Sequence, residues 1–183
     1  MSVAHFPQIT TDRLILEPFS QSHSGGVYLL WSNADVCRYS GDAQDWEGQR
    51  IELPARSPLD SDNILDFFIR RATEGTGVRW AMILKESGEC IGALGLNALN
   101  PIPELAFHLH PDAWGVGYAG EACRAVMAWS ENRLPARTME AYIEEGNTNS
   151  RRLAKSLGFQ ATESSRDGAT RFERISERPI RNA

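Results

Sequence analysis

The chain has 183 residues, of which 42% are hydrophobic, and it carries a formal net charge of −5. This length suits one hydrophobic core, so we expect a single domain over residues 1–183. The acidic balance argues against nucleic acid as a partner, because nucleic-acid interfaces need clustered cationic residues. Cys37, Cys90 and Cys123 have no CxxC spacing, which predicts free thiols rather than a disulfide framework or a zinc site.

The sequence also lacks the segments that direct a protein to or across a membrane. Residues 1–10 contain neither the charged nor the apolar region of a signal peptide. No run of about 18 apolar residues occurs in the chain. We therefore expect a cytoplasmic protein with no membrane partner.

The first part of the chain predicts one strand and two helices. A polar lead-in, a short apolar run and a proline over residues 10–19 indicate the strand. The spacing of apolar residues predicts helices over 22–31 and 60–74, the second capped by Asp62. Residues 42–58 have no regular pattern and are expected to be irregular.

Three strands with short connections follow. Two apolar runs over 78–85 and 89–97 are joined by Glu-Ser-Gly, which indicates a hairpin. A third run with alternating side chains covers 104–109. Consecutive strands with short connections predict an antiparallel meander.

A glycine-rich loop over 115–120 follows the third strand, and a helix is expected over 119–134. Three glycines in six residues let the backbone approach a ligand closely, and the start of a helix offers unpaired N–H groups. The loop therefore predicts an anion site, most simply for phosphate. Its G-x-G-x-x-G spacing also fits a dinucleotide fingerprint, with Glu140 as the ribose-binding acid.

The last part of the chain predicts a strand, a helix and a hairpin. The strand covers 138–144, and the helix begins at Asn147 or Thr148 and ends at Gly158. The hairpin covers 160–175 and turns at an Asp-Gly pair. These elements leave no room for the second half of a doubly wound dinucleotide-binding sheet.

Three stretches carry recognisable motifs, and the first covers residues 111–122, which read PDAWGVGYAGEA. It resembles the coenzyme loop of the GNAT acetyltransferases, in particular the Rim-type enzymes that acetylate ribosomal-protein amino termini, with Trp114 where the general GNAT pattern has Gln or Arg. Residues 11–16 resemble the opening T-x-R-L-x-L. Residues 147–159 are similar to the N-x-x-S stretch, although Lys155 stands one position before the usual lysine.

The resemblance covers about residues 11–175 and implies the α/β (α+β) GNAT fold, a mixed, mostly antiparallel sheet of about seven strands with about four helices. It implies an N-acetyltransferase that moves an acetyl group from acetyl-CoA directly to a primary amine in a ternary complex, without a metal. The amine belongs to a protein amino terminus or a small molecule, and the chain is a monomer or a homodimer. The alternatives are a non-catalytic acyl-CoA-binding sensor and a nicotinamide-dinucleotide-binding protein.

The resemblance also implies roles for particular side chains. Glu104 begins an E-L-A-F string like the base-bearing strand of several acetyltransferases, so it is the expected general base. His108 and His110 share its strand face and are competing bases. The backbone N–H near His108 and Leu109 is expected to polarise the thioester carbonyl. The helix after residue 147 has no tyrosine, so Ser150 is the expected proton donor.

One set of residues is expected to contact the coenzyme and another set the acceptor. The coenzyme contacts are expected from Leu109, Trp114, Gly115, Val116, Gly117, Tyr118, Ala119, Gly120, Asn147, Ser150 and Arg151. Other cations that could pair with its adenosine phosphate are Arg124, Arg152 and Lys155. Acceptor contacts, or alternatively a solvated loop, are expected at Trp46, Arg50, Pro54 and Pro58.

Overall fold

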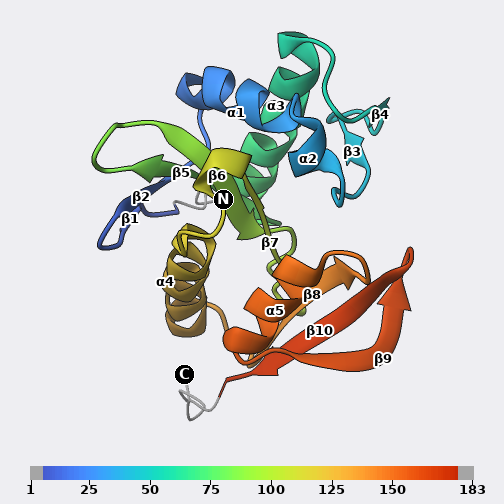
Figure 1. Ribbon diagram of the computed structural model, residues 1–183. Coiled ribbons are helices and arrows are strands. Elements are labelled where there is room, and N and C mark those ends of the chain that lie inside the picture. Colours follow the sequence, from blue (N-terminus) through green and yellow to red (C-terminus); the bar gives the residue numbers. More distant parts are fainter. Residues whose placement is uncertain (1–5, 177–183) are drawn as a thin grey trace.

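The computed structural model describes residues 6–176, and its larger sheet is a five-stranded antiparallel one in the order β1-β2-β5-β6-β7 (Figure 1). The strands are β1 (Ile9–Thr10), β2 (Leu14–Pro18), β5 (Val78–Leu84), β6 (Cys90–Leu96) and β7 (Leu105–Leu109). The expected meander is confirmed as β5, β6 and β7. Each of these strands pairs antiparallel with the next because the connections are short.

A smaller antiparallel sheet lies beside the larger one, in the order β8-β10-β9. Its strands are β8 (Thr138–Glu144), β9 (Gln160–Arg166) and β10 (Ala169–Ile175). Within residues 6–176, the strand pairing between the two sheets is a single parallel bridge from Glu104 to Glu140. Beyond that bridge β7 and β8 diverge, and Figure 1 shows the smaller sheet standing apart from the larger.

The α/β class, the mostly antiparallel character and the approximate number of strands are confirmed, but the strands are divided between two sheets. The two sheets hold five and three strands, where about seven in one central sheet were expected. The divergence of β7 from β8 divides the sheet. A third, minimal sheet pairs β3 (Ala43–Gln44) with β4 (Arg50–Ile51), inside the segment expected to be irregular.

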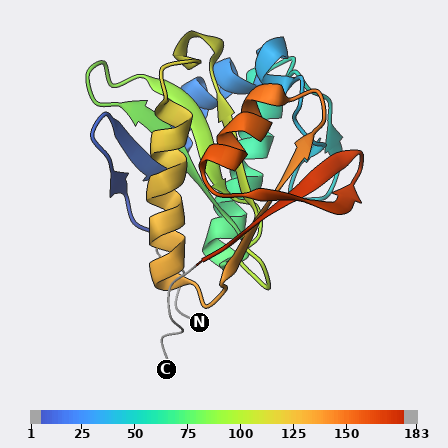
Figure 2. The same ribbon diagram turned by 60° about the horizontal axis from the view of Figure 1, so that its bottom comes forward.

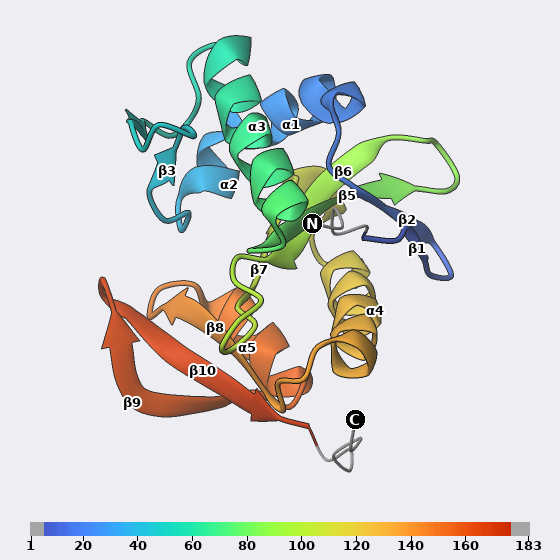
Figure 3. The ribbon, with the colours of Figure 1, turned by 180° about the vertical axis from the view of Figure 1, so that it is seen from behind.

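Helices cover both faces of the larger sheet. One face carries α1 (Ser24–Trp31) and α3 (Pro58–Glu74), which lie together in Figure 3, with the short α2 (Ala34–Cys37) beside them. The other face carries α4 (Tyr118–Arg133), which stands in front of the sheet in Figure 2. The fifth helix, α5 (Thr148–Ser156), packs on the smaller sheet. Two 3₁₀ turns, η1 (Gln21–His23) and η2 (Pro111–Ala113), complete the set within the described range.

The alternation of side chains along the strands separates two hydrophobic clusters. Trp80 and Met82 of β5 are fully buried against the α4 face, whereas Ala81 between them faces α1 and α3. Ala93 of β6 is the small neighbour of Ala81 on the same face. Small side chains at these two positions let the α1 and α3 layer approach the sheet closely.

The start of α3 differs from the expectation. Its N-cap is Ser57, whose Oγ accepts a hydrogen bond from the Asp60 amide, and the Asp60 carboxylate accepts one from the Ser57 amide. Asp62, the expected cap, lies inside the helix and accepts a hydrogen bond from Ser24 Oγ of α1. The helix therefore begins at Pro58, where a missing N–H costs nothing.

The expected hairpin near the end of the described chain is confirmed as β9 and β10. Asp167 and Gly168 have φ values of 52° and 83° in the turn between these strands. Two consecutive positive φ values suit the twist of a two-residue hairpin, which explains the Asp-Gly pair. None of the helices formed by residues 6–176 has the length and apolar character needed to cross a bilayer.

Candidate active site

The divergence of β7 from β8 opens a cavity of about 750 Å³ between the two sheets. Its walls come from β7 and β8, from α3 and the segment after α2, and from one face of α5. Glu104 and His108 of the β7 segment line it, and so does Ser150 of α5. Residues 6–176 contain no group of three or more His, Cys, Asp or Glu side chains arranged to hold a metal ion.

The backbone of β7 faces the cavity with every second residue. The His110 amide donates to Ile91 and the Asn97 amide donates to Glu104, so the even-numbered residues of β7 pair with β6. The odd-numbered residues therefore direct their N–H groups to the other edge of β7, toward β8. Beyond the bridge at Glu104, β8 has moved away from this edge and does not pair with it. Of the two amides expected to polarise a carbonyl, that of Leu109 points away from β6 and that of His108 points toward it, although Leu109 itself does not line the cavity.

The glycine loop is built to expose backbone donors. Gly115 and Gly117 have φ values of 76° and 90°, a region that other residues rarely adopt. Gly117 is the N-cap of α4 and has no side chain to cap the first turn. Within the described part of the chain, the amides of Gly115, Val116 and Gly117 donate to no other group. Uncapped amides at a helix N-terminus form an anion site.

The side chains around the loop have three different settings. The Trp114 ring and the Val116 side chain are about half exposed, and Trp114 Nε1 donates to the Leu109 carbonyl at 2.7 Å. Tyr118 and Ala119, the first residues of α4, are partly buried. Gly120 is buried, and a Cβ there would lie 3.4 Å from Leu153 of α5. Its missing side chain therefore lets α4 and α5 approach each other beside the cavity.

The first turn of α5 brings Ser150 to the cavity. The Asn147 side chain caps the helix by accepting a hydrogen bond from the Ser150 amide at 3.2 Å, as one of the two expected caps. Ser150, Leu153, Ala154 and Leu157 line the cavity together, which confirms that they share a helix face. Among the described residues, Ser150 Oγ has no hydrogen-bond partner, so its hydroxyl is available to a ligand.

The cations considered for the adenosine phosphate differ in their exposure and in their contacts with the protein. Arg151 Nη1 donates to Thr170 Oγ1 at 3.2 Å, and its guanidinium lies 5.1 Å from the Phe172 ring centre, so it is held against the smaller sheet. Arg124 is exposed on α4, and its Nη1 lies 3.4 Å from the position of a Cβ on Gly120. Arg152 and Lys155 are exposed on α5. A phosphate contact from Arg151 stays a prediction.

Glu104 is the centre of a chain of polar side chains inside the cavity. Only 8% of Glu104 is exposed, and its two carboxylate oxygens accept hydrogen bonds from Asn97 at 2.7 Å and from Arg166 at 2.8 Å. Arg79 Nη2 donates to Asn97 Oδ1 at 2.6 Å. The Arg166 guanidinium lies 3.7 Å from the Tyr142 ring centre. One carboxylate is thus held between two arginines, directly by Arg166 and through Asn97 by Arg79.

Arg79, the buried arginine among the polar side chains around Glu104, keeps its charge. Burial lowers the pKa of Arg79 to about 10, with a further decrease from Arg71 and an opposing increase from Glu104. Arg79 is therefore a cation at neutral pH although only 3% of it is exposed. Arg79 was not among the residues expected at the site from the sequence, although a lone arginine in the apolar strand VRWAMIL was a visible signal.

The two histidines of the expected strand face have different positions. His108 lines the cavity, and its Nε2 lies 2.9 Å from Ser40 Oγ. Burial and then the charge of Arg79 lower the pKa of His108 to about 3, so its imidazole is neutral and a weak base. His110 does not line the cavity. It lies beyond β7 and caps η2, where its Nδ1 accepts a hydrogen bond from the Asp112 amide.

Part of the cavity wall comes from residues 42–58, the segment in which acceptor contacts were expected. Asp42, Gln44 and Leu53 line the cavity, but the four residues expected there do not. Trp46 packs against Phe67 and under Arg70 of α3. Its ring therefore anchors the segment, which matches the alternative of a solvated loop held by one aromatic residue.

Comparisons with known proteins agree with this geometry. A profile described as "Acetyltransferase (GNAT) domain" matches residues 13–160. The uncharacterized N-acetyltransferase YoaA of Bacillus subtilis is 28% identical over 158 residues, which are 85% of this chain and 84% of YoaA. RimL, a ribosomal L7/L12 α-N-protein acetyltransferase solved with coenzyme A, has a TM-score of 0.76 at 17% identity, covering 93% of this chain and 99% of its own. A putative ribosomal-protein-serine acetyltransferase from Vibrio cholerae also has a TM-score of 0.76, at 15% identity, covering 95% and 99%.

Proposed function

The chain belongs to the GNAT family of acetyltransferases, and from this premise we propose that it transfers an acetyl group from acetyl-CoA to a primary amine. The observation that carries the proposal is the presence of three features on β7, at its start in the cavity and in the loop that follows it. These are the uncapped amides of the glycine loop, the free edge of β7, and the polar chain around Glu104. They match the three parts of the reaction, which are coenzyme binding, carbonyl polarisation and proton removal.

The coenzyme site uses backbone atoms. The amides of Gly115, Val116 and Gly117 and the first turn of α4 bind the pyrophosphate, since each presents a donor without another partner. Acetyl-CoA supplies the acetyl group as a thioester. The Leu109 amide on the open edge of β7 donates to the thioester carbonyl and stabilises the negative charge that develops there.

Two side chains handle the protons. A protein α-amino group has a pKa of about 8, so a carboxylate can take its proton at neutral pH, directly or through one water. Glu104 does this through the lone pairs that Asn97 and Arg166 leave free. Ser150 donates a proton to the departing thiolate from the opposite wall of the cavity. His108 remains neutral and holds Ser40.

The acceptor is a protein amino terminus or a small-molecule amine. It enters the cavity past aromatic side chains from three elements, which are Tyr39 after α2, Phe67 of α3 and Tyr142 of β8. RimL and the Vibrio cholerae protein are both named for ribosomal-protein acceptors, which makes ribosomal-protein termini the first candidates for this chain.

The alternatives predict different ligands or no turnover. A dinucleotide-binding protein would need parallel strands before and after the glycine loop, whereas β5, β6 and β7 are antiparallel. A non-catalytic sensor would bind acetyl-CoA without releasing thiol in the presence of amines. The free Ser150 hydroxyl and the Glu104 carboxylate both face the cavity, which supports turnover.

The test is release of coenzyme A thiol with a panel of amines. The panel contains peptides with free amino termini, the same peptides with blocked termini, amino acids and polyamines, and mass spectrometry locates the added acetyl group. We expect thiol release that depends on a free amine and matches the acetylated product in amount. Thiol release without any acetylated amine, or none with tight acetyl-CoA binding, would contradict the proposal.

A further inference from the structure

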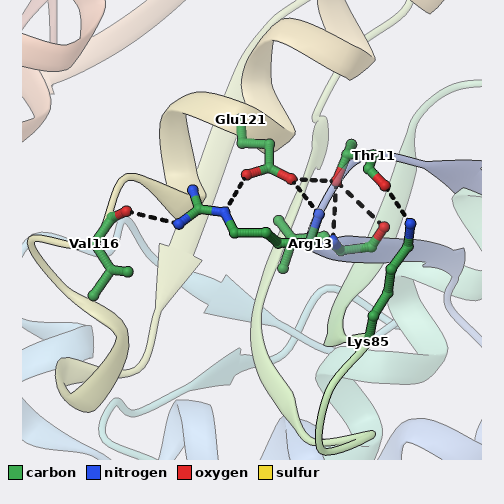
Figure 4. A network of polar contacts seen from close by, with 6 residues as sticks. Thr11, Arg13, Lys85, Val116 and Glu121 are labelled. Atoms are coloured by element: carbon green, nitrogen blue, oxygen red, sulfur yellow. Dashed lines mark hydrogen bonds and ion pairs between the residues drawn. The ribbon is translucent and has the colours of Figure 1, made fainter.

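Arg13 connects the start of β2 to the glycine loop, although the two lie far apart in sequence (Figure 4). Its Nη1 donates to the Val116 carbonyl at 3.1 Å, and its Nε donates to Glu121 Oε2 at 2.7 Å. Its guanidinium lies 4.4 Å from the centre of the Tyr118 ring. One side chain thus contacts the loop, the first residue of α4 and the first acidic residue of α4.

The bond to Val116 sets the direction of a loop amide. In a trans peptide, the carbonyl of one residue and the N–H of the next point to opposite sides. Because the Val116 carbonyl points toward Arg13, the Gly117 N–H points away from it. That amide donates to no other group within residues 6–176, so it is free for a ligand on the side of the loop opposite Arg13.

The bond to Glu121 removes a charge conflict. Glu121 lies in the first turn of α4, where its carboxylate is close to the site for an anion. Its Oε1 accepts hydrogen bonds from Thr11 Oγ1 at 2.6 Å and from the Arg13 amide at 2.8 Å, and its Oε2 accepts from Arg13 Nε. Burial would raise the pKa of Glu121, but these bonds and the charge of Arg13 lower it below its usual value.

The rest of the network fixes Arg13 itself. Thr11 Oγ1 accepts a hydrogen bond from the Leu14 amide at 3.0 Å, and Lys85 donates to the Thr11 carbonyl. The turn from β1 to β2 is therefore bonded to Lys85, directly after β5, as well as to the glycine loop, as Figure 4 shows. The loop is held by a rigid part of the larger sheet.

We propose that Arg13 is a positioning residue for the coenzyme loop, which fixes the Val116–Gly117 peptide and compensates the charge of Glu121 before coenzyme binds. The proposal rests on the proposed function, because it takes the pyrophosphate of acetyl-CoA as the anion at this loop. A loop with two glycines at positive φ has many alternative conformations, and holding it in one of them lowers the entropy that binding costs.

The experiment measures acetyl-CoA affinity by calorimetry and steady-state kinetics for the wild type and for Arg13→Gln. We expect binding about tenfold weaker and a higher KM for acetyl-CoA with kcat nearly unchanged, because one charge-assisted contact to the loop is lost. S-acetylpantetheine, which lacks the pyrophosphate, should be used equally well by both proteins. Arg56→Gln, which removes an exposed ion pair with Glu52, serves as the control and should change neither value.

Two further variants separate positioning from simple stability. Arg13→Lys keeps the charge but not the two-pronged geometry, so it should recover part of the affinity. The double variant Arg13→Gln/Glu121→Gln should bind acetyl-CoA more tightly than Arg13→Gln alone, because the uncompensated carboxylate is gone. A general loss of folded protein would not make the double variant and Arg13→Lys bind acetyl-CoA more tightly than Arg13→Gln.

The outcomes distinguish the two proposals. Wild-type protein that does not bind acetyl-CoA would overturn the proposed function and this inference with it. Wild-type binding with an equal affinity in Arg13→Gln would overturn this inference alone. An equal loss of activity with acetyl-CoA and with S-acetylpantetheine would also overturn it, since the effect would then not depend on the pyrophosphate.

Discussion

The proposed coenzyme site at the glycine loop and the proposed acceptor site in the cavity are built from different parts of the polypeptide. At the proposed coenzyme end, the donors are backbone amides in an exposed loop, and two glycines at positive φ give the loop its shape. At the acceptor end, the polar groups are buried side chains, with Glu104 held between Asn97 and Arg166. The first arrangement depends on conformation, and the second depends on side-chain identity.

This difference has a functional consequence. Backbone amides suit a ligand that is the same for every member of a family, because no side chain has to be kept for the contact. Side chains suit the part of the reaction that differs, which is recognition and deprotonation of the acceptor. Substitutions at the two ends should therefore have separable effects on coenzyme affinity and on turnover.

The largest effect is expected at the coenzyme end. The double substitution Gly115→Asp/Gly117→Asp introduces strained φ values and two negative charges beside the phosphate site. We expect acetyl-CoA affinity to fall at least about 100-fold, or more than about 2.7 kcal/mol. Calorimetry measures it, with Gly25→Asp of α1 as the control, because that glycine has open space around it and no positive φ. Retained affinity would refute the assignment of the loop.

The next effect tests the acceptor end. Glu104→Gln keeps the shape of the side chain but removes the base, so turnover should fall about 100-fold. The dissociation constant of acetyl-CoA should change by less than about twofold, since no coenzyme contact is lost. Glu140→Gln is the matched control, because Glu140 lies across the bridge and pairs with Arg171. Unchanged turnover in Glu104→Gln would exclude Glu104 as the base.

A smaller effect is expected for the proton donor. Ser150→Ala removes a hydroxyl that faces the cavity, and we expect kcat to fall about tenfold because water replaces it in part. Ser156→Ala on the same helix is the control, since the Ser156 hydroxyl donates to the Leu153 carbonyl on the exposed side. Equal rates for the two variants would show that Ser150 does not transfer the proton.

The last effect concerns protein stability rather than ligand binding or turnover. The pKa of His108 is about 3 in the folded protein and near 6.5 when unfolded, so the unfolded chain binds the extra proton between these values. Above pH 6.5 His108 is neutral in both states and does not make the free energy of unfolding depend on pH. Below pH 6.5 the unfolded state gains the proton, so the free energy of unfolding falls as the pH falls, with a slope of at most about 1.4 kcal/mol per pH unit. Urea unfolding from pH 7 to pH 4 should show a flatter dependence for His108→Leu than for the wild type. His110→Leu should keep the wild-type slope, and a flat slope there would contradict the assignment.

The elements around the proposed coenzyme loop were largely predictable from the sequence because their signals are local. The glycine spacing, the strand before it and the helix after it are contiguous, and all three elements are confirmed. The cap of α5 at Asn147 and the turn at Asp167-Gly168 are local in the same way. Local backbone chemistry decides such features, so a short stretch of residues carries them.

The acceptor end could be predicted only in part because it is assembled from distant segments. Glu104 was identified, but its partner Arg166 lies 62 positions away on β9, and Arg79 reaches it from β5 through Asn97. The bond between Arg13 and Glu121 spans 108 positions. No local pattern encodes such pairs, and the divergence of β7 from β8 that opens the cavity follows from the packing of whole sheets.

Thermal unfolding of the wild-type protein with acetyl-CoA, and with NADH as the comparison ligand, tests the central claim most directly. A ligand at 100 times its dissociation constant adds about 2.7 kcal/mol to the free energy of unfolding. For a domain of this size, that raises the midpoint by roughly 5–10 °C. We predict a rise of this order with acetyl-CoA and none with NADH. A rise with NADH alone would contradict the assignment of the glycine loop and the mechanism built on it.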